Sequence, residues 1–359
     1  MENKKKPVSV KTKLDIEDIE FYDARCGIFD IYGLLDAYNE NEAFHRIPFD
    51  VAEKTSPAVK NLNCNTSGGR IRFRTDSEYV AINMEFLSEW KGSVGNMNVI
   101  GASGFDIYTY IDEKPIYFGS YNPGSVHGKG FEAVVKFETR KERELLINFP
   151  LYDSCEKLYI GLKKNATLTN GAKYKHERPI VYYGSSITQG GCASRPGNSY
   201  PGMLSRYFDT DFVNLGFSGA CKAEDAMIEY IPTLDMSIFV YDYDANAPTN
   251  EHLAETHEKL FKAFRKVQPS TPVIIMSGTH IPLTPNAVKT RKIRHDIIYG
   301  TYLNAKNSGD NNVYFVDGQE IFKICGYDAC TCDTIHPNDL GFYCMSEAVK
   351  KVIEENSLL

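Results

Sequence analysis

Five short apolar runs in the second half of the chain, each followed by a segment of helical length, constrain the fold more than any other feature. In chain order they read PIVYYG, DFVNLG, SIFVYD, PVIIM and VYFV. Strands that are apolar on both sides have both faces covered, and helical connections allow neighbouring strands to run parallel. We therefore predict an α/β/α three-layer domain with a parallel sheet in the middle.

The segments between these runs have the pattern of amphipathic helices. In one long segment, residues 250–269, the apolar side chains recur at helical spacing and fall on one face. They are Leu253, Leu260, Phe261 and Phe264. Further helices are predicted over residues 198–208, 224–234, 287–309 and 337–356.

From about residue 20 to 165 the apolar residues alternate with polar ones instead. Residues 68–77 place Ile71 and Phe73 on one face and three arginines on the other, and no helical stripe is sustained anywhere in this half. Residues 104–121 predict two strands joined at Asp112-Glu113-Lys114-Pro115. We predict an antiparallel, jelly-roll-like β-sandwich over residues 1–170, followed by the α/β domain over residues 171–359.

Composition narrows the classes of partner. The 359 residues carry a net charge of −7, and the longest basic run is Lys4-Lys5-Lys6, so a nucleic-acid partner is not expected. The sequence has no run of 18 apolar residues, so a membrane span is not expected. The first residues lack the apolar core of a signal peptide, which favours a cytoplasmic location. The oligomeric state is left open.

Nine cysteines, an odd number, favour reduced thiols over a disulfide framework. Four of them crowd the C-terminal quarter, namely Cys325, Cys330, Cys332 and Cys344. Their C-x4-C-x-C spacing lacks the paired C-x2-C of structural zinc sites, so small buried side chains are the preferred interpretation. We expect neither a metal nor a cofactor.

Small and polar residues follow the predicted parallel strands, at the sheet edge where such folds place their ligands. The first strand ends in Gly-Ser-Ser-Ile-Thr (184–188), which is neither a P-loop nor the G-x-S-x-G of α/β-hydrolases. Gly219 follows the second strand. The third strand leads through Asp242 and Asp244 to Asn246. Instead of forming part of an oxyanion hole, this segment could bind Mg²⁺ through its two aspartates, although no phosphate-binding loop accompanies them.

The last block, CDTIHPNDLGF, holds Asp333 and His336 three residues apart. In a turn, this spacing lets a carboxylate orient an imidazole that accepts a proton from a serine. Together the four blocks supply a nucleophile, oxyanion donors and an oriented base, which is the set that acyl transfer requires.

These blocks resemble those of the SGNH hydrolases, also called GDSL-like esterases and lipases. In addition, GFDIY (104–108) is similar to the Gly-x-Asp-Leu-Tyr signature of a β-sandwich that precedes the catalytic domain in a bacterial subgroup. The resemblance implies that Ser186 is the nucleophile and that Ser185 stands where the wider family has aspartate. It further implies an oxyanion hole of Ser186, Gly219 and Asn246, with His336 as base and Asp333 as acid.

By the same resemblance, the expected activity is a serine esterase that removes small acyl groups, O-acetyl above all, from carbohydrates or other small esters. A short-chain lipase or thioesterase and an inactive glycan-binding protein are the alternatives. The tyrosines and Trp90 fit either a carbohydrate platform or the core, and core is the preferred interpretation.

Overall fold

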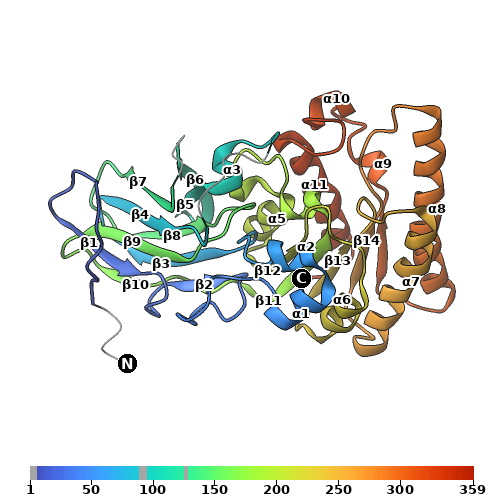
Figure 1. Ribbon diagram of the computed structural model, residues 1–359, viewed down its shortest axis with the longest axis horizontal. Coiled ribbons are helices and arrows are strands. Elements are labelled where there is room, and N and C mark those ends of the chain that lie inside the picture. Colours follow the sequence, from blue (N-terminus) through green and yellow to red (C-terminus); the bar gives the residue numbers. More distant parts are fainter. Residues whose placement is uncertain (1–5, 89–94, 125–127) are drawn as a thin grey trace. The chain divides into compact units, whose positions relative to one another are not determined.

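The structure, a computed structural model, describes residues 6–88, 95–124 and 128–359, which leaves Trp90 outside the described part (Figure 1). The chain divides into two compact units. The first comprises the residues up to Arg46, Cys64–Tyr174 and Ser194–Gly197. The second comprises Ile47–Asn63, Lys175–Ala193 and Asn198–Leu359.

Two antiparallel sheets make up the first unit. One has the order β1-β9-β4-β7, formed by Ile19–Asp23, Lys157–Lys163, Tyr79–Glu85 and Gly130–Lys136. The other has the order β10-β3-β8-β5-β6, formed by Leu168–Asn170, Arg70–Thr75, Arg143–Asn148, Phe105–Ile111 and Lys114–Tyr121, and β2 (Asp30–Tyr32) also pairs with β3. Side chains of both sheets, such as Ile71 and Ile107 from one and Ile82 and Ile160 from the other, share one buried core. The predicted sandwich is confirmed.

The predicted hairpin is present as β5 and β6. Ile111 pairs with Lys114 across a two-residue turn. Asp112 and Glu113 in that turn have φ of 48° and 62°, the left-handed conformation that type I′ hairpin turns require.

The arginines of β3 depart from the simple alternating pattern. Arg70 and Arg72 are 1% and 2% exposed although they lie opposite the apolar face. Arg70 Nε donates to the hydroxyl of Tyr174 at 2.8 Å, and the Arg72 guanidinium lies 4.6 Å from the centre of the same ring. Aromatic side chains thus cover this part of the outer face.

The first unit also includes the short segment Ser194–Gly197, which is bound by the GFDIY residues. Arg195 Nη1 lies 3.0 Å from Asp106 Oδ2 and also bonds the hydroxyl of Tyr108. The backbone amide of Gly197 donates to the same carboxylate oxygen at 2.8 Å, and Asn148 donates to the other oxygen at 2.7 Å. Every oxygen of the buried Asp106 carboxylate therefore has a donor.

The first half also contains short helices that the sequence pattern did not indicate. Among its described residues these are α1 (Phe49–Thr55), α2 (Pro57–Leu62) and α3 (Val99–Ser103). Each spans two turns or fewer, too few for a periodic apolar stripe to stand out. Ala52 of α1 and Val59 of α2 are buried in the core of the second unit.

The second unit contains the predicted parallel sheet. Its order is β12-β11-β13-β14-β15, formed by Thr210–Gly216, His176–Gly184, Ile238–Asp242, Val273–Met276 and Val313–Val316. All four neighbouring pairs are parallel. The expected α/β domain is confirmed.

Helices cover both faces of this sheet (Figure 1). They are α5 (Tyr200–Phe208), α6 (Asp225–Tyr230), α7 (Asn250–Val267), α8 (Pro285–Asn307) and α11 (Asp339–Glu355). Tyr183 of β11 lies in a core with side chains of α6, α7 and α8, including Phe264. The next residue, Tyr182, points to the other face, where its ring packs 5.5 Å from that of Tyr200 in α5, which in turn stacks on Phe342 of α11. Neighbouring tyrosines of one strand thus serve two separate layers.

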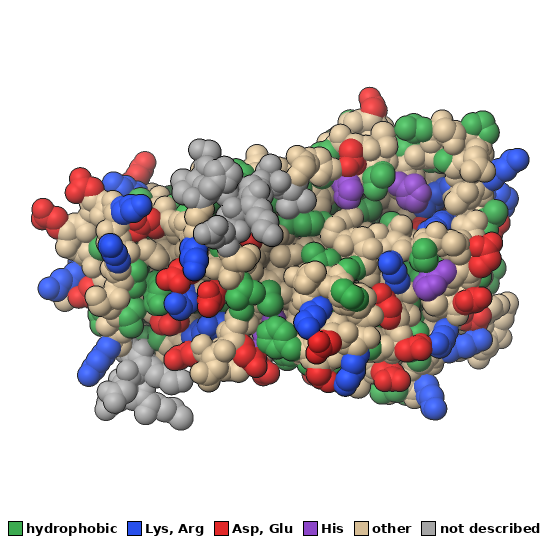
Figure 2. All heavy atoms as spheres, in the orientation of Figure 1, with side chains coloured by type: hydrophobic (Ala, Val, Ile, Leu, Met, Phe, Trp, Pro, Cys, Tyr) green, Lys and Arg blue, Asp and Glu red, His purple; other side chains and the backbone are tan. Residues whose placement is uncertain are grey.

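Within the described residues, no helix has the length and hydropathy that crossing a bilayer demands. Figure 2 shows side chains of both charges interspersed over the face that it draws. The four apolar residues predicted to face inward from α7 are all buried.

Candidate active site

Three neighbouring strands of the parallel sheet, β12, β11 and β13, end at the same level. Gly184 at the end of β11 is paired with Gly216 of β12 on one side and with Asp242 of β13 on the other. Ser186, Gly219 and Asn246 follow these strand ends by two, three and four residues. The parallel sheet therefore delivers three of the predicted site residues to one edge.

Ser186 is the first residue of the short helix α4 (Ser186–Gln189). Ser185 caps this helix, because its hydroxyl accepts a hydrogen bond from the amide of Ile187 at 3.2 Å. The glycine before it is required sterically, since a Cβ on Gly184 would lie 2.0 Å from Thr188 Oγ1. The turn thus holds α4 directly against the strand ends.

The structure brings Ser186, His336 and Asp333 into one hydrogen-bonded line. Ser186 Oγ lies 2.9 Å from His336 Nε2, and His336 Nδ1 lies 2.7 Å from Asp333 Oδ2. The serine is 7% exposed, whereas the imidazole and the carboxylate side chains are 24% and 33% exposed. This geometry allows proton transfer from the hydroxyl to the ring.

The two oxygens of Asp333 have different partners. Oδ2 faces the imidazole, while Oδ1 accepts hydrogen bonds from the backbone amides of His336 at 2.7 Å and Ile335 at 3.1 Å. Partial burial acts to raise the pKa of Asp333, but these hydrogen bonds outweigh it, so that the pKa lies below its usual value. The carboxylate is therefore ionised at neutral pH and suited to stabilise an imidazolium.

A tight loop carries both residues. It follows α10 (Tyr327–Cys330) and precedes α11, and its two arms are joined by hydrogen bonds from Cys332 N to His336 O and from Asn338 N to Cys330 O, both 2.9 Å. The loop is also attached to the segment after β14, because the amide of Ile281 donates to Thr334 O at 3.1 Å. These bonds fix the position of the imidazole.

Gly219 and Asn246 are also linked to one another through their loops. Gly219 has φ of +68°, which favours glycine, and open space lies where a Cβ would be. Asn246 Oδ1 accepts a hydrogen bond from the amide of Cys221, two residues after Gly219, at 3.3 Å. Since the oxygen is engaged in this way, the NH₂ group is the part of the side chain left to donate to an oxyanion.

Sequence reasoning missed a buried polar network beneath the serine. Thr188 Oγ1 donates to Asp242 Oδ2 at 2.8 Å, and Asn214 Nδ2 donates to the carbonyl of Thr188 at 2.7 Å. On the opposite side of α4, the amide of Ser218 donates to Gln189 Oε1 at 2.9 Å. The only signal in the sequence was the presence of polar residues inside apolar strands, which must find partners when buried.

The two aspartates considered for Mg²⁺ have separate surroundings. Asp244 lies 2.7 Å from Arg291 and 3.1 Å from Arg294, and its pKa is lowered because the arginine charges outweigh burial. Burial raises the pKa of Asp242 to about 7, although hydrogen bonds from Thr188 and Tyr200 and the charge of Arg291 act in the opposite direction. With Asp244 already neutralised by two guanidinium groups, the pair is not an available site for a divalent cation.

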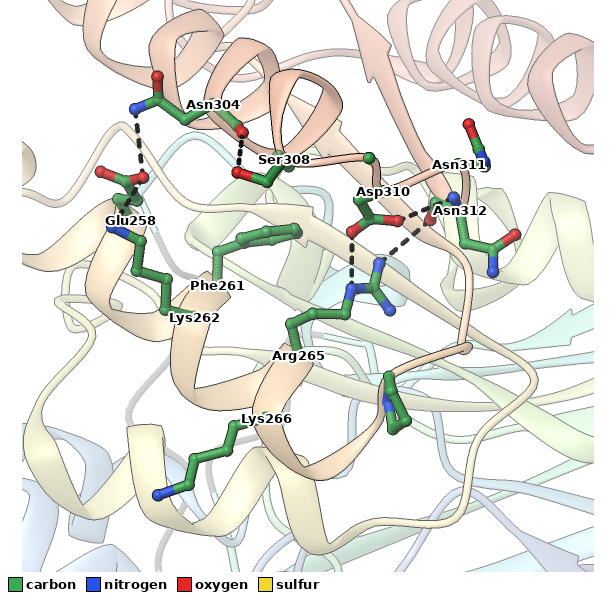
Figure 3. Close-up of a pocket in the computed structure, with 13 residues that line it drawn as sticks. Glu258, Phe261, Lys262, Arg265, Lys266, Asn304, Ser308, Asp310, Asn311 and Asn312 are labelled. Carbon is green, nitrogen blue, oxygen red and sulfur yellow. Dashed lines mark hydrogen bonds and ion pairs between the residues drawn. The ribbon is translucent and has the colours of Figure 1, made fainter.

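A groove of about 580 Å³ elsewhere in the second unit is unrelated to these residues (Figure 3). It lies between the C-terminal parts of α7 and α8 and the segment before β15, at the opposite edge of the sheet from Ser186. Its central side chain, Arg265, binds Asp310 at 2.8 Å and the carbonyls of Gln268 and Thr271. These contacts join the end of α7 to the segments before β14 and β15, so Arg265 has a structural role here.

Comparison with known families agrees with the two-part architecture. A model of the GDSL-like lipase/acylhydrolase family matches residues 177–354. A second model, the GxDLY N-terminus of SGNH-hydrolase-type esterases, matches residues 19–168. Among curated proteins, no sequence match was found.

Solved structures share the fold over most of the chain. A protein from Bacteroides ovatus assigned as a GDSL-like lipase is 29% identical, with a TM-score of 0.83 over 94% of this chain and 97% of that one. A salicylyl-acyltransferase from a tetracycline biosynthetic pathway (18% identity, TM-score 0.73, 96% and 99% covered) has a similar fold. So does an acetyl xylan esterase from the rumen bacterium Butyrivibrio proteoclasticus (11% identity, TM-score 0.57, 95% and 99% covered).

Proposed function

The chain belongs to the GDSL-like lipase/acylhydrolase family and is a carboxylic ester hydrolase, and from that premise we propose that it removes small acyl groups, chiefly O-acetyl, from carbohydrates. The observation that carries the proposal is the line from Ser186 Oγ through His336 to Asp333, with separations of 2.9 and 2.7 Å. A serine with an oriented base is the machinery of acyl-enzyme catalysis.

In the proposed mechanism, His336 Nε2 takes the proton of Ser186 as the serine oxygen attacks the ester carbonyl. Asp333 holds the Nδ1–H of the ring and stabilises the imidazolium. The protonated ring then gives its proton to the departing alcohol, which leaves an acyl-enzyme. Water, activated by the same nitrogen, attacks the acyl-enzyme and releases the acid and the free serine.

The tetrahedral oxyanion is proposed to be held by the backbone amides of Ser186 and Gly219 and by the NH₂ group of Asn246. Each donor follows a strand end at the same sheet edge, and the Cys221 amide orients the Asn246 side chain. Fixed donors of this kind stabilise developing charge without reorganising during the reaction.

The substrate class is supported by the fold. The acetyl xylan esterase named above and a family two carbohydrate esterase from Cellvibrio japonicus share the fold along nearly the whole chain. Both names describe enzymes that act on carbohydrate esters.

The deciding experiment measures acetate release from a panel of acetylated oligosaccharides, beside hydrolysis of p-nitrophenyl acetate and p-nitrophenyl octanoate. The proposal expects acetate release from oligosaccharides and a clear preference for acetate over octanoate. Preference for octanoate would instead identify a short-chain lipase or thioesterase. Absence of turnover together with inertness toward a serine-directed phosphonate would identify a binding protein. Ser186→Ala is the inactive control.

A further inference from the structure

Three cysteine side chains from separate segments of the second unit converge on one point. Cys325 follows helix α9 (Gly318–Ile321), Cys330 is the last residue of α10, and Cys344 lies within α11. Their sulfur atoms all lie within 4.8 Å of one another, and those of Cys325 and Cys344 are 3.6 Å apart. The fourth nearby cysteine, Cys332, lies against Cys192 instead.

We propose that Cys325, Cys330 and Cys344 form a binding site for a thiophilic d¹⁰ cation, Zn²⁺ in the first place. Three thiolates and one water molecule would complete its tetrahedral coordination. The proposal departs from the expectation of no metal, which rested on the sequence spacing of the cysteines. That spacing did not show that α11 brings Cys344 next to Cys325. It does not depend on the esterase activity.

The separations suit such an ion. With Zn–S bonds of about 2.3 Å, two thiolates of a tetrahedral site lie about 3.8 Å apart. The Cys325–Cys344 pair already has this spacing, and a contraction of about 1 Å at most brings the third sulfur to it. Rotation of side chains is enough for a change of that size.

Hydrophobic packing does not account for this cluster. Cys330 is buried, but Cys325 is exposed and Cys344 is partly exposed, so the three thiols do not form part of a closed apolar core. Cys325 and Cys344 also line a groove of about 850 Å³, which gives an ion and its water ligand a route from solvent. The site therefore has both a ligand set and access.

Without a cation, the thiols of Cys330 and Cys344 are held in their protonated form. Burial and the neighbouring Cys325 raise the pKa of Cys344 to about 12, and burial raises that of Cys330. A bound metal reverses this preference, because coordinating thiols lose their protons. One Zn²⁺ would release three protons and leave a site with a net charge of −1.

The site would also join the two ends of the loop that carries Asp333 and His336. Cys330 O accepts the amide of Asn338 at 2.9 Å, and a Cβ on Gly341 would lie 2.2 Å from the same oxygen. α10 and the first turn of α11 are thus already in close contact. A metal bound to Cys330 and Cys344 would hold them together more firmly.

The test begins with protein purified under reducing conditions in the presence of a chelator. Zn²⁺ is added back and its stoichiometry and affinity are measured by competition with a chromophoric chelator, beside the release of protons. The same titration with Cd²⁺ reports thiolate ligation through its near-ultraviolet charge-transfer absorption. We expect one ion per chain and a rise in Tm on binding.

Cys344→Ser and Cys325→Ser should each weaken Zn²⁺ binding by at least about 100-fold, more than the loss of an outer-shell partner. Cys332→Ser, two residues from Cys330, and Cys26→Ser in the first unit are matched controls that should bind normally. Loss of binding in Cys332→Ser but not in Cys344→Ser would overturn the assignment. So would the absence of any one-to-one uptake by the reduced wild-type protein.

Discussion

The substitution Asp333→Asn tests the proposed role of the carboxylate with almost no change in size. An amide offers one acceptor oxygen where the carboxylate has two. That oxygen can stay with the backbone amides of His336 and Ile335, or it can face the imidazole, but it cannot do both.

The hydrogen bonds of Asp333 indicate which orientation of the substituted amide is more stable. Turning the NH₂ group toward the two backbone amides would forfeit two hydrogen bonds, each worth about 0.5–1.5 kcal/mol at this solvent-exposed position. Turning the NH₂ group toward His336 Nδ1 keeps both backbone hydrogen bonds and requires only that Nδ1 lose its proton and accept a hydrogen bond. The ring then carries its proton on Nε2, the atom that lies 2.9 Å from Ser186 Oγ, and can no longer act as a base.

We therefore expect Asp333→Asn to lower kcat by about 10⁴-fold, equivalent to about 5 kcal/mol of transition-state stabilisation, while the fold is retained. The assay is steady-state hydrolysis of p-nitrophenyl acetate, with thermal unfolding measured in parallel. Asp328→Asn, an exposed carboxylate in α10, is the control and should be fully active. A value of kcat within tenfold of wild type, in a folded Asp333→Asn protein, would refute the reasoning.

Three further predictions concern the same edge of the sheet. Asn246→Ala should remain folded and bind substrate but lose about 10²–10³ in kcat, and near-normal turnover would remove Asn246 from the oxyanion hole. Ser186→Ala should be inactive, whereas Ser185→Ala should keep substantial activity. Ser185→Ala should lose only about 1 kcal/mol of stability, because the helix cap is removed. The reverse result in activity assays would identify Ser185 as the nucleophile. Because the folded pKa of Asp242 is raised to about 7, the contribution of this residue to stability should fall as pH rises from about 4 to 7. Asp242→Asn should remove that contribution, so the difference in unfolding free energy between wild type and variant, measured with urea, should change with pH over this range.

The sequence was sufficient for the parallel sheet because its strands are short, apolar and separated by long helices. Those strands also located the candidate site, since parallel strands end at one edge and the polar residues follow their ends. Asp333 and His336 are about 150 residues from Ser186 in the chain, yet the structure closes that gap to one hydrogen bond.

Features that depend on tertiary packing were not predictable in the same way. Arg70 and Arg72 alternate with apolar residues as solvent-facing side chains would, but Tyr174, about 100 residues later in the chain, covers them. The Thr188–Asp242 bond under the serine and the convergence of Cys344 with Cys325 also join distant segments. Local periodicity contains no information about such pairs.

Each compact unit contains one segment from the other half of the sequence. Ile47–Asn63 belongs to the second unit, and Ser194–Gly197 belongs to the first. A fragment beginning at Lys175 would lack α1 and α2 and, with them, Ala52 and Val59 of its own core. A fragment ending at Tyr174 would lack Arg195, the cation that binds Asp106. A single cut between residues 174 and 175 therefore leaves both compact units without one of their own segments.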